Sequence, residues 1–168
     1  MKRKNLAFTL IELLVVVAII GILTAIGVSA YRGYSFAAGA SITKKNHQQI
    51  VNLLKTVLTQ CDVLGVEGQI NISKLIGNQN DNNIIFCNTF KTTAANLVSY
   101  LATNLNSSGF KNPYNSSQGA YAWDTERVGQ TLIGTRGGSY TFVTNYYNTD
   151  GASVKFEEPW ILDQRKGK

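Results

Sequence analysis

The sequence predicts an α+β protein in which one long N-terminal helix carries a small globular head. Two observations indicate the helix: residues 8–30 form an apolar run, and a helical apolar periodicity continues beyond it to about residue 60. A second helical segment followed by candidate strands, between residues 92 and 157, indicates the head. We therefore expect an antiparallel sheet packed against the outer half of the long helix.

The apolar run is long enough to cross a membrane. As a helix rising 1.5 Å per residue, Phe8–Ala30 reaches about 35 Å, more than the roughly 30 Å hydrocarbon core of a bilayer. Lys2, Arg3 and Lys4 adjoin its start, whereas Arg32 follows its end. Because cationic residues gather on the cytoplasmic side of a span, this charge density favours a cytoplasmic N-terminus.

Glu12 is the single charged residue of the run. A carboxylate in hydrocarbon costs about 3 kcal/mol on insertion scales and persists mainly where it has a partner. The hydroxyl of Thr9, three residues earlier on the same helical face, can share a hydrogen bond but cannot cancel the charge. The sequence therefore points to a cation from outside the chain as the partner of Glu12.

Residues 7–13, Ala-Phe-Thr-Leu-Ile-Glu-Leu, closely resemble the class III signal of type IV prepilins. In that family a peptidase removes a short basic leader just before a Phe, and the new terminal amine is methylated. The resemblance implies cleavage and N-methylation at Ala7 and Phe8. It also implies that Glu12, which shares a helical face with Thr9, pairs during assembly with the terminal amine of a neighbouring subunit.

The resemblance extends to about residue 31 and has two departures. The residue before the cut is usually Gly and is Ala7 here, and many members carry a helix-kinking Pro where this chain has Ser29. The pilin architecture that it implies divides the chain into a leader (1–7), a transmembrane and assembly half of the helix (8–30), an outer half (31–60) and a globular head (61–168).

Three other interpretations of the N-terminus compete with this one. A conventional secretory signal has a basic start and a small-residue cleavage site, here Val28-Ser29-Ala30, but its apolar core is shorter and lacks a residue such as Glu12. A plain single-span anchor accounts for the length of the run but not for Glu12 or Ala7-Phe8. A buried helix of a soluble protein conflicts with hydrophobicity on every side of the helix.

Beyond the membrane segment, the helix is expected to become amphipathic. Its apolar positions run from Ile42 to Cys61, whereas His47 and its neighbours form a polar side on which a solvated histidine is expected. Residues 31–36, with Gly39, are the expected place for a bend, because glycines weaken helices and aromatic residues suit a membrane interface.

The head is expected to form a single core. Residues 62–83 are predicted to be a connection with little regular structure, and residues 92–106 a second helix. The expected strands are Ala120–Asp124, Thr131–Thr135, Ser139–Tyr147 and Ser153–Glu157. The expected core and sheet-face aromatics are Trp123, Tyr140, Phe142, Tyr146, Tyr147 and Trp160.

The two cysteines, Cys61 and Cys87, are expected to pair, because two cysteines in an oxidising compartment more often bond than not. Two free buried thiols are the alternative. The family pattern instead places a disulfide loop near the C-terminus, so the surface role of that loop is not expected for this pair.

We expect no enzymatic activity and no cofactor. His47 is the single histidine, and no metal-spaced His or Cys cluster, catalytic triad or phosphate-binding loop accompanies it. Asp124, Glu126, Asp150 and Asp163 show no ordered calcium-ligand pattern. The basic tail, residues 165–168, is a small footprint for DNA and is expected to be solvated.

The expected function is that of a structural subunit of a type IV pilus, processed by a prepilin peptidase and methyltransferase and polymerised with copies of itself or other pilins by an assembly platform. We expect the subunit to lie in the bacterial inner membrane before assembly and in a surface pilus afterwards. The alternatives are a type II secretion pseudopilin and a minor pilin that binds DNA or a surface. The sequence does not separate roles in adhesion, motility, DNA uptake and secretion.

Overall fold

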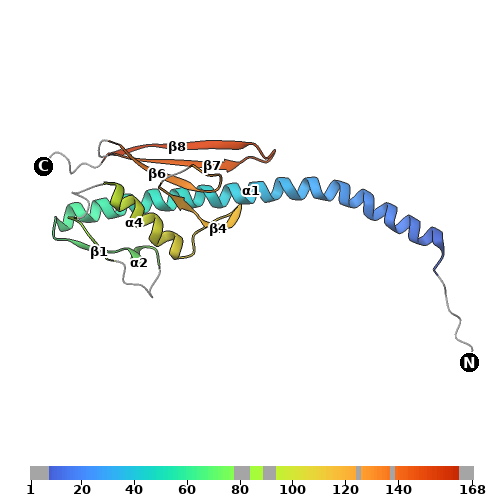
Figure 1. Cartoon of the computed structure of the whole chain (residues 1–168), viewed down its shortest axis with the longest axis horizontal. Coiled ribbons are helices and arrows are strands. Elements are labelled where there is room, and N and C mark those ends of the chain that lie inside the picture. The colour runs from blue at the N-terminus through green and yellow to red at the C-terminus, as the bar shows by residue number, and fades with distance from the viewer. Residues whose placement is uncertain (1–7, 78–83, 89–93, 124–125, 137–138, 163–168) are drawn as a thin grey trace, which may run out of the picture.

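The computed structural model describes residues 8–77, 84–88, 94–123, 126–136 and 139–162. Figure 1 shows one long helix whose C-terminal half lies within the head and whose N-terminal half projects away from it. The predicted α+β fold class is confirmed. The elements in chain order are α1 (Leu10–Leu64), β1 (Gln69–Asn71), α2 (Ile72–Leu75), β2 (Ile84–Phe86), α4 (Ala94–Ser107), β3 (Lys111–Asn112), β4 (Asn115–Gly119), β5 (Tyr121–Ala122), β6 (Thr131–Arg136), β7 (Ser139–Tyr147) and β8 (Ser153–Leu162).

Helix α1 is uninterrupted over 55 residues. It therefore continues through residues 31–39, where we expected a bend, and ends at Leu64 instead of about Gln60. Figure 1 shows a gradual curve of its N-terminal half without a break. Gly65 terminates the helix with a φ of 73°, a conformation in which glycine avoids the steric cost of a side chain, and its N–H donates to the Cys61 carbonyl.

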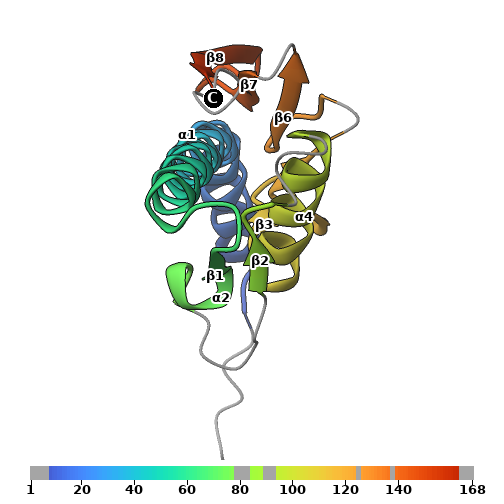
Figure 2. The same ribbon diagram turned by 90° about the vertical axis from the view of Figure 1, so that its left-hand side faces the viewer.

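The outer half of α1 forms the centre of the head. It packs against β7 on one side and β1 on another, and α4 packs against β5 and β6. Figure 2, which looks along the spine, shows β7 and β8 on one side of α1 and β1 and α2 on the other, with α4 beside it. The residues of α1 in the core are Ile50, Val51, Leu53, Leu54, Val57, Leu58 and Cys61.

The main sheet has the strand order β5-β6-β7-β8. The pairs β6–β7 and β7–β8 are antiparallel, as expected, but β5 joins the edge parallel to β6. Two small antiparallel sheets, β1–β2 and β3–β4, complete the head. The connection at 62–83, which was predicted to have little regular structure, contains the end of α1, the short strand β1 and the short helix α2; residues 78–83 of it lie outside the described residues.

His47 is buried, which corrects the prediction of a solvated residue. Its side chain is 2% exposed and its Nδ1 lies 2.7 Å from the hydroxyl oxygen of Thr144 on β7. That oxygen is also 2.8 Å from the hydroxyl of Thr131 on β6, so a buried polar chain joins α1 to two strands. The sequence carried a signal for this burial, since His47 stands three and seven residues before Ile50 and Leu54 on one helical face.

The other ring nitrogen of His47 lacks a hydrogen bond. Nε2 is buried without a hydrogen-bond partner and lies 3.8 Å from a carboxylate oxygen of Glu158 on β8. The rings of Phe142 and Phe156 approach the imidazole edge-on. This burial lowers the pKa of His47 below its ordinary value, although the nearby Glu158 carboxylate opposes the shift.

The end of the head nearest the membrane half of α1 is fixed to this helix by hydrogen bonds of Tyr114 and by the contact of the Phe36 and Tyr147 rings. Tyr114, between β3 and β4, donates from its hydroxyl to the Phe36 carbonyl at 3.4 Å and accepts from the Tyr147 N–H at 3.3 Å. Gly39 permits this approach, because a Cβ at that position would overlap the Tyr114 ring. The β7–β8 turn also reaches α1, where the carbonyl of Thr149 lies close to Gly33.

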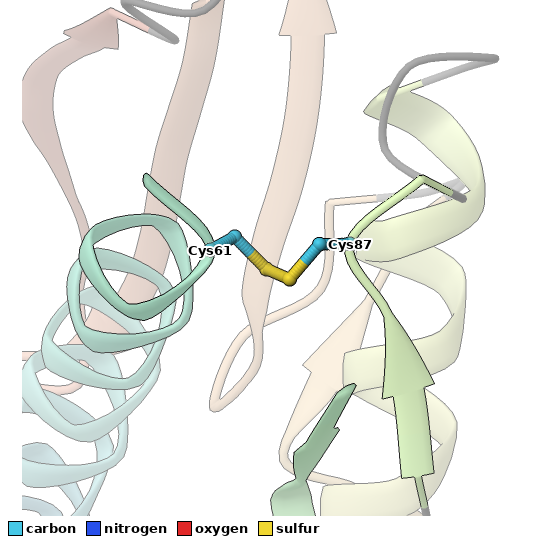
Figure 3. The surroundings of a disulfide bond; sticks show 2 residues. All are labelled: Cys61 and Cys87. Atoms are coloured by element: carbon cyan, nitrogen blue, oxygen red, sulfur yellow. A yellow bond between two sulfur atoms is a disulfide. The ribbon is translucent and has the colours of Figure 1, made fainter. Parts of the chain in front are cut away.

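A disulfide joins Cys61, near the end of α1, to Cys87, which directly follows β2 (Figure 3). The bond closes a loop with a sequence separation of 26 residues and therefore ties the β1–β2 segment to the spine. Both cysteines belong to the core. In the chain-entropy model such a loop stabilises the fold by about 3.5 kcal/mol.

Reduction of Cys61–Cys87 is expected to lower the melting temperature of the full chain in detergent by roughly 10 °C, because the unfolded chain gains conformational freedom. Circular dichroism measures the change. As a control, alkylation of the denatured, unreduced protein should label neither thiol by mass spectrometry. Two labelled thiols in protein taken directly from intact cells would contradict the bond.

Acidification is expected to destabilise the head through His47. Since its folded pKa lies below the unfolded value, the unfolded chain binds a proton first, and stability declines as the pH falls below about 6.5, by at most about 1.4 kcal/mol per pH unit. His47→Asn keeps a polar group near Thr144 but does not titrate, so its melting temperature should depend less on pH between 5 and 7. If the melting temperatures of the two proteins fall equally between pH 7 and pH 5, His47 does not cause the loss of stability in acid.

Candidate functional site

The N-terminal half of α1 forms a continuous apolar surface without contacts to the head. The most apolar 18-residue window of this helix has a mean hydropathy of 2.7, and none of it is buried. Large apolar side chains from Phe8 to Val28 are exposed on every side. Because water-soluble proteins rarely expose so large an apolar area, α1 has the length and composition of a membrane-spanning segment.

Thr9 and Glu12 form a capping box at the start of α1. The backbone N–H and the hydroxyl of Thr9 donate to Oε2 of Glu12 at 2.8 and 2.7 Å, and the Glu12 N–H donates back to the Thr9 hydroxyl at 3.4 Å. These bonds satisfy backbone donors that the first turn of a helix leaves unpaired. The structure therefore assigns Thr9 a local role, which is to hold the Glu12 carboxylate beside the helix end.

One oxygen of the Glu12 carboxylate, Oε1, is available to accept a hydrogen bond from a second partner. Both bonds from Thr9 reach the same oxygen of Glu12, and within the described residues no hydrogen bond reaches Oε1. No Lys, Arg or His of the described residues forms an ion pair with Glu12. The charge is thus unpaired inside the described chain, as the sequence indicated, while the side chain is held in a defined position.

Polar groups farther along the membrane half are satisfied within the helix. The Thr24 hydroxyl donates to the Ile20 carbonyl at 2.8 Å, and the Ser29 hydroxyl donates to the Ile26 carbonyl at 2.9 Å. A hydroxyl bonded in this way is compatible with hydrocarbon, where an unpaired polar group costs several kcal/mol. Glu12 therefore differs from the other polar side chains of this half, because its charge has no counterpart in the helix.

The two predicted processing residues lie at the edge of the described region. Ala7 lies outside the described residues, and Phe8 precedes the first residue of α1 and is exposed. The peptide bond between them is thus followed within two residues by the capping box. Phe8, the residue after the predicted cut, lies two residues before Leu10, the first residue of α1.

The other candidate groups do not gather into a site. Among the described residues, no group of three or more His, Cys, Asp or Glu side chains is placed to hold a metal ion. Glu126 pairs with Lys155 at 3.3 Å, and the side chain of Asp150 is exposed in the β7–β8 turn. Asp124, Asp163 and the basic tail at 165–168 lie outside the described residues.

The predicted aromatic positions divide between core and surface. Tyr140 and Phe142 are fully buried in the core, and Tyr146 and Tyr147 are half-buried on β7. Trp123 is exposed, which corrects its assignment to the core or a sheet face. The side chain of Trp160 lies outside the part of β8 whose side chains are described.

Comparison with known proteins agrees with this geometry at the N-terminus. The family model of the prokaryotic N-terminal methylation motif matches residues 2–28, which include all but the first residue of the predicted leader, the capping box and most of the apolar run. No curated protein and no solved structure gave a significant match to the chain. The N-terminal segment of this chain is therefore a type IV prepilin-like class III signal that carries the prokaryotic N-terminal methylation motif.

Proposed function

We propose that this chain is the precursor of a structural subunit of a type IV pilus or pilus-like filament, and that it acts by polymerisation instead of catalysis. The observation that carries the proposal is the Glu12 carboxylate, which Thr9 holds in place and which no cation among the described residues neutralises. This carboxylate lies on an exposed apolar helix and within the methylation motif. Such a charge is costly in a membrane unless assembly supplies its partner.

Processing would create that partner. A prepilin peptidase would cut between Ala7 and Phe8, and a methyltransferase would modify the new terminal amine. Removal of Lys2, Arg3 and Lys4 lowers the formal charge of the chain from +6 to +3. It also removes the cations that hold the N-terminus at the cytoplasmic face, so the processed subunit can leave the membrane more easily.

Assembly would then replace lipid contacts with contacts between helices. Small residues recur along the membrane half at Ala18, Gly21, Ala25 and Ser29, and the space around Gly21 and Gly27 is open. In an apolar setting such residues let helices approach closely, so packing and polar pairing drive association. The amine of one subunit would bind Oε1 of Glu12 in its neighbour while Oε2 stays bonded to Thr9.

The proposed cellular location is based on the signal and on α1, the one helix among the described residues that is long and apolar enough to cross a membrane. The subunit would lie in the bacterial inner membrane with its head outside the cytoplasm, where oxidising conditions favour the Cys61–Cys87 bond. An assembly platform with its own motor would draw subunits into a fibre at the cell surface. Other copies of this chain, or related pilins, would be its partners in that fibre.

Fibres sheared from cells that express this chain should contain it with Phe8 as the first residue and one methyl group on the terminal amine, about 14 Da heavier than the unmodified processed chain. Electron microscopy detects the fibres and intact mass measurement identifies the terminus. Cells that lack the chain are the control and should lack the fibres. Assembled protein that begins at Met1 or Tyr31 would contradict the assignment, and unchanged fibres in cells without the chain would remove its structural role.

Glu12→Ala should leave membrane insertion intact and reduce fibre assembly at least tenfold, because the terminal amine loses its partner. Glu12→Gln is the matched control, since it keeps a capping acceptor for Thr9 but removes the charge, and it should assemble equally poorly. Carbonate extraction measures insertion, and quantification of sheared fibres measures assembly. Fibres of Glu12→Gln as abundant as those of the parent would show that the charge has no role in assembly.

A further inference from the structure

A shallow apolar groove runs along the part of α1 that projects from the head (Figure 1). It begins at Ile20, ends at Arg32 and has a volume of about 560 Å³. The aliphatic side chains of Leu23 and Val28 line it. Gly27 also lines it without a side chain, and the space beside this residue is open. The absence of one side chain therefore leaves room for a hydrocarbon chain against the backbone.

The groove has the length of one leaflet of a bilayer. From Ile20 to Tyr31 the helix rises about 17 Å at 1.5 Å per residue, and half of a hydrocarbon core is roughly 15 Å thick. Ile20 lies near the middle of the apolar run at 8–30, and Tyr31 directly follows its end. With the N-terminus at the cytoplasmic face, the groove therefore spans the outer leaflet.

The interior of the groove suits a hydrocarbon chain. Thr24 is the polar residue of its inner part, and the Thr24 hydroxyl already donates to the Ile20 carbonyl at 2.8 Å. A polar ligand would lose its hydrogen bonds to water in such a groove, whereas an acyl chain has none to lose. The lining therefore favours an acyl chain.

The groove is not the surface that we assign to contacts between helices. That surface carries the small residues Ala18, Gly21, Ala25 and Ser29. Gly27 is two residues from Ala25, about 200° around a helix with 3.6 residues per turn, and so lies on nearly the opposite face. When two helices pack through the small residues, the groove still faces lipid.

The outer end of the groove carries an unpaired cation. Arg32 is exposed, and no ion pair or hydrogen bond joins its guanidinium to another group among the described residues. It lies two residues beyond the apolar run, at the level of the lipid phosphates. A guanidinium binds a phosphate through two parallel N–H donors, and the neighbouring Tyr31 is typical of this interface.

An acidic side chain of the head lies close to the same end. The β7–β8 turn meets α1 next to Arg32, where the Thr149 carbonyl would lie 3.8 Å from a Cβ at Gly33. Asp150 directly follows Thr149, is exposed and forms no ion pair within the part of the chain that the structure describes. The charges of Arg32 and Asp150 are therefore both available to a ligand that carries two opposite charges.

We infer that this groove binds one molecule of phosphatidylethanolamine from the outer leaflet. One acyl chain lies along the groove past Gly27, the phosphate binds the Arg32 guanidinium, and the ammonium group faces the Asp150 carboxylate. The inference rests on the proposed membrane location of the subunit, and it names the lipid that the subunit binds before assembly.

The two charges select this headgroup over those of other phospholipids. Phosphatidylglycerol has a phosphate for Arg32 but no cation for Asp150, whose charge would repel it. The trimethylammonium group of phosphatidylcholine is positive but has no N–H to donate to a carboxylate. A primary ammonium group has three such donors. Only phosphatidylethanolamine among these three lipids therefore satisfies both side chains.

Native mass spectrometry of the full chain in detergent tests the site with the dioleoyl forms of these three phospholipids. Phosphatidylethanolamine should form a one-to-one complex with a Kd about tenfold below those of the other two, because it alone pairs with both charges. Arg32→Gln should weaken this complex about tenfold by removing the partner of the phosphate. Gly27→Leu should weaken it to a similar extent by filling the groove.

Matched variants separate the site from general effects. Gly21→Leu adds the same side chain to the same span at another open position, about 120° away around the helix. Arg127→Gln removes one exposed positive charge from the head. Both should bind phosphatidylethanolamine as the parent does. Asp150→Asn should bind phosphatidylethanolamine and phosphatidylglycerol with similar Kd values, because the carboxylate that distinguishes them is lost.

Equal Kd values for the three phospholipids would overturn the inference, and so would a Gly27→Leu or Arg32→Gln chain that binds phosphatidylethanolamine as tightly as the parent. A preference that survives in Asp150→Asn would overturn the role of this carboxylate. Lipid-free dimers of the parent that Gly27→Leu disrupts would show that a second copy occupies the groove and would also overturn the inference.

Carbonate extraction of cell membranes distinguishes this failure from failure of the proposed location. A full chain released by carbonate would overturn the membrane location and the lipid site together. A chain that carbonate leaves in the membrane, but that shows equal Kd values for the three phospholipids, would overturn the lipid site alone.

Discussion

The burial of the outer half of α1 is the constraint on which the rest of the structure depends. Among the described elements, α1 has 55 residues, whereas the longest strand has 10 and α4 has 14, and Figure 1 shows the outer half of α1 running through the head. The sheet packs on one side of this helix and the β1–β2 segment on another, so the head forms its core around the helix. A change in the orientation of α1 would therefore disturb every layer at once, because close-packed cores do not deform continuously.

The same helix meets two different environments. Its outer half is amphipathic and pairs with the sheet, whereas its membrane half is apolar all round and satisfies its own hydroxyl groups. The helix is continuous across the boundary, and the contacts of Tyr114 with Phe36 and of the β7–β8 turn with Gly33 fix the head close to the end of the span. The head is thus joined directly to the membrane segment, and a force applied to one is transmitted to the other.

Polar side chains have separate roles in the two halves. In the head, His47, Thr144 and Thr131 form a buried chain that connects the spine to the sheet, and neutrality of the imidazole suits this dry environment. At the N-terminus, Glu12 keeps a charge that only Thr9 contacts within the described residues. The buried chain of His47 and the two threonines stabilises the subunit by itself. The Thr9–Glu12 pair leaves a charge that favours binding to a cationic partner.

The sequence by itself determined the membrane segment, the methylation motif and the presence of a long spine, whose end it placed about four residues early. These depend on local order: an unbroken apolar run, a fixed spacing from Ala7 to Glu12 and a helical periodicity. The antiparallel strands β6, β7 and β8 were also predictable from their own alternation and turns. Only the tertiary structure decided the contact of His47 with Thr144, the parallel direction of β5 and the exposed position of Trp123. Each of these depends on which surface comes to lie opposite a residue, and segments as far apart as His47 and Thr144 meet only when the whole chain is folded.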